Sequence, residues 1–170
     1  MRRLADIGGG TGRLIADLLA AHPGMRGILF DLPNVVAGTP ALLQVSGVEA
    51  RGEVIGGSFF DSVPAYADAY LLRAILHNWD DEGSIAILKS VRKAAPEDAV
   101  LLIIERVLPE RAEMGMAVDS YLLDLELLVN TPGGRERSES EFREILNTGF
   151  GPPRLIQTTT ATSLLEARPA

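Results

Sequence analysis

The segment Asp6-Ile7-Gly8-Gly9-Gly10-Thr11-Gly12 constrains the fold of this chain more than any other part of the sequence. It follows a short apolar run, Arg3–Ile7, and precedes an amphipathic stretch that predicts a helix over 12–21 with Thr11 as its cap. Glycines in such a turn let a ligand approach the backbone, and the start of the helix offers free N–H groups. The segment therefore predicts a strand–turn–helix unit with a binding turn at its centre.

The rest of the chain continues the alternation of strands and helices. Further strands are expected at 27–31, 53–55, 67–72 and 99–105, and further helices at 32–44, 80–95, 114–129 and from Ser138, with a capping box to Glu141, to about Gly149. The continuous apolar run at 99–105 is typical of a strand covered on both faces. Two closing strands, 154–159 and 163–167, are expected to pair as a hairpin. The pattern predicts a mostly parallel α/β sheet with an antiparallel hairpin and helices on both faces.

Length and composition limit the classes of function. The 170 residues suit one domain spanning 1–170. The absence of cysteine excludes disulfides and thiolate metal sites, and the net charge of −7 argues against a nucleic-acid partner. No apolar run approaches the about 20 residues of a membrane-spanning helix, and the N-terminus lacks the apolar segment of a signal peptide. We therefore expect a cytoplasmic protein with no membrane partner.

The glycine spacing separates two kinds of ligand. A dinucleotide fold calls for G-x-G-x-x-G, but Arg13 stands where the third glycine would be. The spacing Gly8-x-Gly10-x-Gly12, with an acidic residue two positions ahead, resembles the loop of class I methyltransferases, which bind S-adenosylmethionine. Asp31, at the end of the second expected strand, is placed to accept the ribose hydroxyls. The alternatives are a turn without a ligand and an Asp31 that only caps the next helix.

A second candidate site follows the fourth expected strand. His77 lies just past that strand, Glu105 is the last residue of the fifth, and Glu136 lies in a loop ahead of a helix. Ligands of open α/β sheets bind at the carboxyl ends of the strands, and a histidine with carboxylate partners is a candidate base. The alternative is that His77 is a helix cap or a core residue. His22 is assigned to a helix C-terminus.

Six ordered motifs carry a resemblance to a known family. They are Asp6–Gly12, Phe30–Pro33, Gly56–Phe60, Leu76–Asp81, Glu105–Pro109 and Pro132–Arg137. In order and spacing they resemble the caffeate-type small-molecule O-methyltransferases, most closely bacterial members that act on polyketides and other natural products. The resemblance spans nearly the whole chain and implies a class I methyltransferase fold with a Rossmann-like sheet.

The resemblance also implies roles for single residues. His77 would be the catalytic base, steadied by Glu105 and Glu136. The residues expected to bind S-adenosylmethionine are Asp6, Gly8, Gly10, Gly12, Asp31, Leu32, Ser58, Phe59 and Arg73. Met116, Leu123 and Leu127 would form one wall of the acceptor pocket, although they are equally well explained as core residues.

The chain departs from the family pattern in several places. Ser58 and Asn78 stand where relatives usually have Asp, and Thr131 stands where plant members have an acceptor-contacting Asn. The family also has an N-terminal helical dimerisation domain that this sequence does not show. We therefore expect either a fragment, a truncated product or a minimal relative, with an apolar surface on the 114–128 helix that favours self-association.

The expected activity is transfer of a methyl group from S-adenosylmethionine to a phenol or similar small-molecule hydroxyl, leaving S-adenosylhomocysteine. His77, neutral near pH 7, would remove the hydroxyl proton. No metal is expected, since no cluster of ligands in the sequence points to one. The alternatives are a fragment that only binds the cofactor, and a relative that uses it for decarboxylation or hydroxylation.

Overall fold

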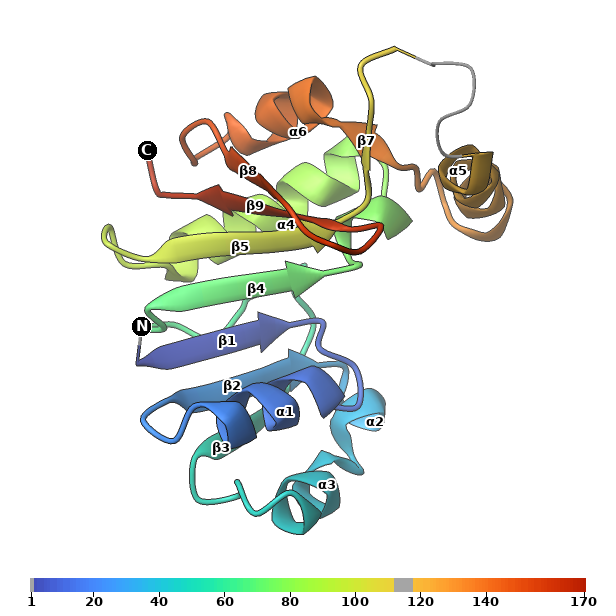
Figure 1. Cartoon of the computed structure of the whole chain (residues 1–170). Helices are drawn as coiled ribbons and strands as arrows, with labels where there is room; N and C mark the ends of the chain where they lie inside the picture. Colours follow the sequence, from blue (N-terminus) through green and yellow to red (C-terminus); the bar gives the residue numbers. More distant parts are fainter. Residues whose placement is uncertain (1, 112–117) are drawn as a thin grey trace.

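A computed structural model describes residues 2–111 and 118–170, and its centre is a seven-stranded sheet (Figure 1). The strands run in the order β3-β2-β1-β4-β5-β9-β8. Strands β1 to β5 are parallel, and β9 is antiparallel to both of its neighbours. The bounds are β1 (Arg3–Ile7), β2 (Arg26–Asp31), β3 (Gly52–Gly56), β4 (Ala69–Arg73), β5 (Val100–Glu105), β8 (Arg154–Gln157) and β9 (Ser163–Ala167). The predicted fold class and closing hairpin are confirmed.

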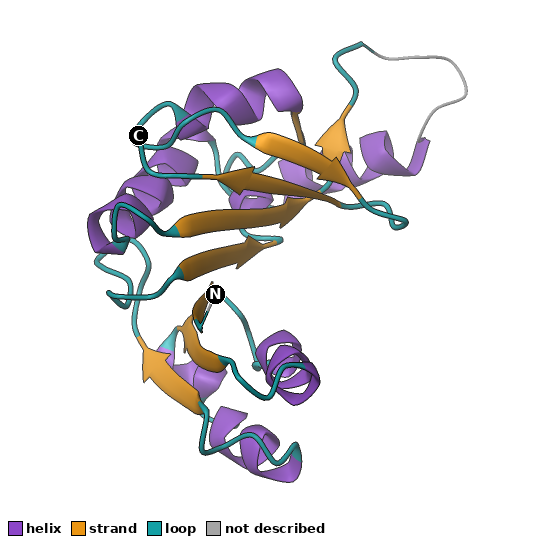
Figure 2. Cartoon of the chain, turned by 60° about the vertical axis from the view of Figure 1, so that its left-hand side comes forward, coloured by secondary structure: helices purple, strands orange, loops and turns teal. Residues whose placement is uncertain are grey.

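Helices cover both faces of the sheet (Figure 2). They are α1 (Arg13–Ala21), α2 (Pro33–Val36), α3 (Thr39–Val45), the 3-10 helix η1 (Leu76–Asn78), α4 (Asp81–Ala94), α5 (Val118–Asn130) and α6 (Glu139–Leu146). Alternate residues of the central strands enter two separate cores. One core packs against α4 and α6, and the other against α1 and α3. This division follows from the strand repeat of two, which sends successive side chains to opposite faces.

Two helix starts follow the sequence pattern. Asp80 accepts the N–H of Gly83 and caps α4. Ser138 and Glu141 form the predicted capping box at the start of α6, each side chain accepting the other's backbone N–H. The last turn of α1 ends at His22 as expected, and the N–H of His22 donates to the carbonyl of Leu18.

Several sequence expectations are wrong in detail. The helix predicted over 32–44 is two helices, α2 and α3, and the chain turns between them at Ala37 and Gly38. Thr11 does not cap α1, because the chain enters that helix through Gly12 in the left-handed conformation, with φ of 86°. The helix predicted over 138–149 ends at Leu146. Residues 114–117 of the helix predicted over 114–129 lie outside the described residues.

Strand β5 is covered less completely than its apolar run predicts. Leu101 and Ile103 are buried in the core under α4 and α6, whereas Val100, Leu102 and Ile104 are only partly buried on the opposite face. Full cover on both faces is therefore wrong for β5. The apolar residues of β5 are fully buried on one face of the sheet and partly buried on the other.

Helix α5 stands apart from the sheet, beyond the carboxyl ends of the parallel strands (Figure 1). Four of its apolar side chains are largely exposed: Leu122, Leu125, Leu128 and Val129. This confirms the expected apolar surface for the described part of the helix. Within the part of the chain that the structure describes, no helix has both the length and the apolar character to cross a membrane.

Candidate active site

The sheet order reverses direction between β1 and β4. The chain leaves β1 toward β2 on one side, while β4 and β5 lie on the other. A crevice at the carboxyl ends of the strands forms at such a point, and it is where ligands of open α/β sheets bind. The glycine segment follows β1, and the His77 segment follows β4. The two candidate sites of the sequence therefore lie on either side of one crevice.

The glycine segment is a tight backbone turn. Gly8 and Gly9 both donate their N–H groups to the carbonyl of Phe30 at distances of 2.7 and 3.4 Å. Gly8 has φ of 71°, and a Cβ atom there would overlap the side chain of Ile75, which follows β4. The first turn of α1 has no side-chain cap. A side chain at Gly8 would be strained and would push apart the two halves of the crevice, so glycine is required there.

Two carboxylates flank this turn in different environments. Asp31 is half-buried, and its two oxygens accept the N–H groups of Gly10 at 2.8 Å and Leu32 at 2.7 Å. Asp6 is 1% exposed, and its Oδ2 has no hydrogen-bond partner among the described residues. Burial raises the pKa of Asp6 to about 7, the charge of Arg73 acts against this, and the charge of Asp31 adds to it. Oδ2 of Asp6 is thus a buried acceptor without a hydrogen-bond partner in the described part of the chain.

The other predicted cofactor residues lie around the same turn. Phe59 is partly buried, faces Gly8 and packs edge-on against Phe60 and Trp79. The hydroxyl of Ser58 accepts the N–H of Phe60 at 3.2 Å. Leu32 and Arg73 are exposed, at the ends of β2 and β4. Gly12 supplies the start of α1, so the structure gathers the predicted cofactor residues at one edge of the sheet.

His77 sits on η1, a short helix that the sequence did not reveal. Glu105 organises it: Oε1 of this buried carboxylate accepts the N–H groups of Ile75, Leu76 and His77 at 3.0, 2.9 and 3.4 Å. Its Oε2 lies 3.4 Å from Nδ1 of His77. Burial raises the pKa of Glu105 to about 6, the charge of His77 lowers it, and the charge of Glu136 raises it. Glu105 therefore both caps the helix and faces the imidazole.

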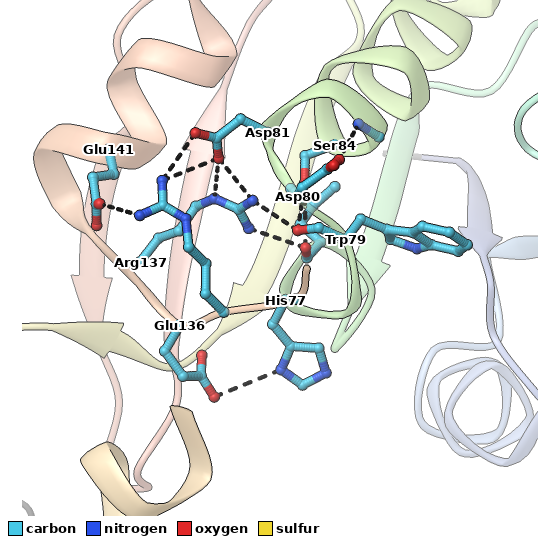
Figure 3. A network of polar contacts seen from close by, with 12 residues as sticks. His77, Trp79, Asp80, Asp81, Ser84, Glu136, Arg137 and Glu141 are labelled. Carbon is cyan, nitrogen blue, oxygen red and sulfur yellow. Dashed lines mark hydrogen bonds and ion pairs between the residues drawn. The ribbon is translucent and has the colours of Figure 1, made fainter. Parts of the chain in front are cut away.

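Glu136 approaches the same imidazole nitrogen from another segment. Its Oε1 lies 3.6 Å from Nδ1 of His77, and its side chain is 4% exposed (Figure 3). Its backbone N–H donates to Oδ1 of Asp124 on α5 at 2.8 Å. Burial, the largest influence, lowers the pKa of His77, but the contact with Glu136 and the charges of both glutamates outweigh it. The pKa of His77 consequently lies above its ordinary value.

A second, two-stranded sheet brings the glutamates together. Strand β6 (Val107–Leu108) follows Glu105, strand β7 (Arg137–Ser138) follows Glu136, and the two strands pair in parallel, with Val107 opposite Arg137. Gly134 makes the approach to η1 possible, since a Cβ atom there would lie 2.5 Å from the carbonyl oxygen of His77. The sequence placed these residues in separate motifs but did not predict this pairing.

The three side chains also form a group of the kind that binds metal ions. One ligand atom from each of His77, Glu105 and Glu136 lies within 4.8 Å of the others. The expectation that the chain has no such group is therefore wrong, because residues far apart in sequence meet here. That the reaction needs no metal stays a prediction.

An arginine-rich network lies next to the imidazole, and sequence reasoning missed it. Arg137, whose side chain is fully buried, donates to the carbonyls of Leu76 and Trp79 and to Asp81 (Figure 3). Arg135 also donates to Asp81, and to Glu141. Burial raises the pKa of Asp81, but the hydrogen bonds and charges of Arg137 and Arg135 together outweigh it and hold that pKa below its ordinary value. The one signal in the sequence was the run of alternating charge at 135–137.

Two residues that depart from the family pattern are used locally. The hydroxyl of Thr131 donates to the carbonyl of Leu127 at 2.7 Å and accepts the N–H of Gly134 at 2.8 Å. The amide of Asn78 donates to the carbonyl of Ala74 at 3.1 Å. Thr131 and Asn78 therefore stabilise turns beside the site.

The predicted wall of the acceptor pocket is described only in part. Leu123 and Leu127 are half-buried on α5, and Met116, the third predicted wall residue, lies outside the described residues.

Comparison with known proteins identifies the relatives of this chain. A family model described as an O-methyltransferase domain matches residues 1–151. The O-demethylpuromycin O-methyltransferase of Streptomyces alboniger is 44% identical over 169 residues, which are 98% of this chain and 45% of that protein. The chain thus spans about half the length of the curated relatives that it matches.

Solved structures agree with the sequence match. The crystal structure of LaPhzM superposes with a TM-score of 0.92 at 41% identity, covering 99% of this chain and 50% of that one. The O-methyltransferase NcsB1 of neocarzinostatin biosynthesis, solved with S-adenosylmethionine and 2-hydroxy-5-methyl naphthoic acid, superposes with a TM-score of 0.87 at 34% identity, covering 99% of this chain and 49% of that one.

Proposed function

Since this chain belongs to the O-methyltransferase family, we propose that it binds S-adenosylmethionine and transfers its methyl group to a hydroxyl of a small aromatic acceptor. The observation that carries the proposal is the placement of His77 between two buried glutamates, across one crevice from the glycine turn. NcsB1, which shares this fold, was solved with S-adenosylmethionine and a hydroxylated naphthoic acid.

The residues around the glycine turn fit S-adenosylmethionine. This ligand carries an ammonium group, a ribose diol and an adenine. Asp6 offers a buried carboxylate oxygen with no described partner, which suits a cation. Each oxygen of Asp31 accepts one N–H and keeps a further lone pair for a ribose hydroxyl. Phe59 offers an aromatic surface beside Gly8.

The reaction needs one proton to be removed while the acceptor is held in place. When bound, the cofactor supplies an electrophilic methyl group on a sulfonium. The two glutamates face Nδ1 of His77, so Nδ1 keeps its proton and Nε2 is the free base. Nε2 takes the hydroxyl proton of the acceptor, and the carboxylates stabilise the imidazolium that forms. General-base catalysis of this kind contributes about 10²–10⁴-fold, and positioning contributes about 7–11 kcal/mol.

The electrostatics of the site set the direction of the pH dependence. Burial lowers the pKa of His77, but the contact with Glu136 and the charges of both glutamates outweigh it, so the pKa is raised above its ordinary value. Only the neutral imidazole is a base, so the active fraction grows as the pH rises through that raised pKa. We expect the rate to increase from acid to mildly alkaline pH.

We also propose that residues 1–170 act as one folded unit, and that the exposed apolar side chains of α5 form a contact surface for a second copy of the chain. Leu122, Leu125 and Leu128 lie on this surface. Analytical ultracentrifugation at rising concentration tests this. We expect a dimer whose population falls in the Leu125→Lys variant, and a monomer at all concentrations would contradict it.

The experiment that tests the function is transfer of a labelled methyl group. The chain is incubated with S-adenosylmethionine labelled at the methyl carbon and a panel of phenols and phenolic carboxylic acids, and the label is followed into product. Labelled methyl ether together with S-adenosylhomocysteine supports the proposal. Binding of S-adenosylhomocysteine without label transfer would favour the alternative of a cofactor-binding unit without activity of its own. Loss of acceptor carboxylate with the label retained on the cofactor would favour decarboxylation.

A further inference from the structure

The short helix that carries His77 is held at both ends by buried charges. At its start, Oε1 of Glu105 collects the N–H groups of Ile75, Leu76 and His77. Just past its end, the guanidinium of Arg137 donates to the carbonyl of Trp79 at 2.8 Å, and it also donates to the carbonyl of Leu76, the first residue of the helix, at 3.0 Å. The charges match the helix ends, since a helix start favours an anion and a helix end favours a cation.

The contacts of Arg137 need a planar, forked donor. Its side chain is fully buried, and besides the two carbonyls it donates from Nε and Nη2 to Oδ1 of Asp81 at 3.1 and 2.9 Å (Figure 3). A guanidinium can serve these acceptors from one plane, whereas the ammonium of lysine is a single point charge. Burying an arginine this completely is unfavourable unless its donors are satisfied, so the network specifies one geometry.

Arg137 also fixes the second glutamate. It directly follows Glu136 in the chain and is the first residue of β7. That strand pairs with β6, which follows Glu105 in the sequence. The loop ahead of it passes so close to η1 that Gly134 has no room for a side chain beside the carbonyl of His77. One guanidinium therefore joins the segment that carries His77 to the segment that carries Glu136.

We propose that Arg137 is a positioning residue, which holds the imidazole of His77 and the carboxylate of Glu136 in reach of each other. The proposal rests on the proposed function for its effect on turnover. A misplacement of about 1 Å in such a pair lowers a rate by about 100-fold. Affinity for the methyl donor should not change, because the hydrogen bonds of Arg137 within the described part of the chain go to Asp81, Leu76 and Trp79 and not to the glycine turn.

Arg135 provides a matched control. It binds the same Asp81, at 2.9 and 3.1 Å, and also Glu141, but among the described residues it donates to no carbonyl of the His77 helix. Its side chain is 40% exposed. Loss of Arg135 removes a charge from the same network without releasing that helix.

The test compares R137M and R137K with R135M in the full chain. The imidazole titration of His77 is followed by NMR in the parent and in each variant. The charged groups that face His77 are Glu105 from β5 and Glu136 from the segment before β7, and Arg137 reaches it only through the backbone. In R137M and R137K the pKa of His77 should fall toward that of a free imidazole, and kcat should fall about 100-fold with donor Kd unchanged. R135M should match the parent in all three.

Each outcome of this comparison either supports or overturns the proposed role of Arg137. If R137M fails to fold, as judged by circular dichroism, R137K gives the answer because it keeps the buried charge. A folded R137K or R137M with the parental His77 titration and kcat would overturn the proposal. Equal losses in R135M would overturn it as well, because the effect would then belong to the network in general. If the parent shows no turnover, the proposed function fails, while the His77 titration still decides the role of Arg137.

Discussion

The two halves of the crevice are built by different means. The glycine turn after β1 is one continuous stretch of chain, and its geometry comes from backbone contacts such as those of Gly8 and Gly9 to Phe30. The base region comes from three distant segments, which meet through the β6–β7 pair and a buried ionic network. The glycine turn depends on residues without side chains, whereas the base region depends on charged side chains that are paired with one another.

This contrast has an energetic consequence. A backbone turn tolerates changes in neighbouring side chains as long as glycine remains where φ is positive. A buried ionic network loses far more when one member is removed, because the partner is left unpaired in a dry environment. Substitutions in the base region should therefore change catalysis and pH dependence, whereas substitutions at the glycine turn should change cofactor affinity.

The largest expected effect is on turnover. His77→Gln should lower kcat by at least about 100-fold, because general-base catalysis is lost. Binding of S-adenosylhomocysteine, measured by calorimetry, should stay the same because His77 lies outside the glycine turn. His22→Gln is the control, since His22 only ends α1. Weakened cofactor binding in His77→Gln would show that the two halves are not separate.

The converse substitution is Asp31→Ala. It removes the acceptor of the Gly10 N–H and the proposed acceptor of the ribose hydroxyls. Loss of such charge-assisted hydrogen bonds, about 1.5–3 kcal/mol, corresponds to a Kd about 10- to 100-fold weaker. The NMR titration of His77 should be unaffected. Unchanged calorimetric affinity would remove Asp31 from the cofactor site.

Glu136→Gln should shift the pH dependence of the reaction. One of the charges that raise the pKa of His77 is lost, so the acid limb of the kcat profile should move to lower pH. The amide keeps the shape of the side chain. An acid limb that stays in place would mean that Glu136 does not face the base during turnover.

Asp6→Asn should change the thermal stability of the protein rather than the acid limb of the kcat profile. The pKa of Asp6 is raised to about 7 in the folded protein from 3.8, so its contribution to stability is present below about pH 4 and is lost as the pH rises through 7. The asparagine variant avoids the buried charge. Its Tm relative to the parent should therefore be higher at pH 8 than at pH 5, by about 3 °C or more in thermal melts. A pH-independent difference would contradict this.

The smallest expected effect is that of a chelator. His77, Glu105 and Glu136 are placed as metal ligands would be, but as a base with two carboxylate partners they need no ion. Adding EDTA should leave the rate of methyl transfer unchanged. A loss that is restored by Mg²⁺ or Zn²⁺ would assign this cluster to metal chemistry.

The sequence predicted the fold and the local motifs well, for physical reasons. Strand and helix periodicity gave the sheet and the closing hairpin, and the Ser138–Glu141 box gave a helix start. The glycine turn could be recognised because all its parts are consecutive. The break between α2 and α3 and the entry of α1 through Gly12 depend on backbone angles that composition does not reveal.

The base region was predicted residue by residue but not as an arrangement. His77, Glu105 and Glu136 were named, yet nothing in their spacing showed that both carboxylates face Nδ1 or that a short helix carries the histidine. Arg137 was missed because a charged residue in a loop usually lies in solvent. Its burial comes with the parallel pairing of β6 with β7 and with its contacts to Leu76, Trp79 and Asp81, which join segments far apart in the sequence.

The central claim is that His77 is the base of this crevice, and one pair of measurements on the parent chain tests it directly. Single-turnover rates of methyl transfer are recorded across pH and compared with the NMR titration of His77. The account predicts that the rate rises with pH along the deprotonation curve of His77, with a midpoint above the ordinary value of 6.5. A rate that stays constant while His77 titrates would contradict it.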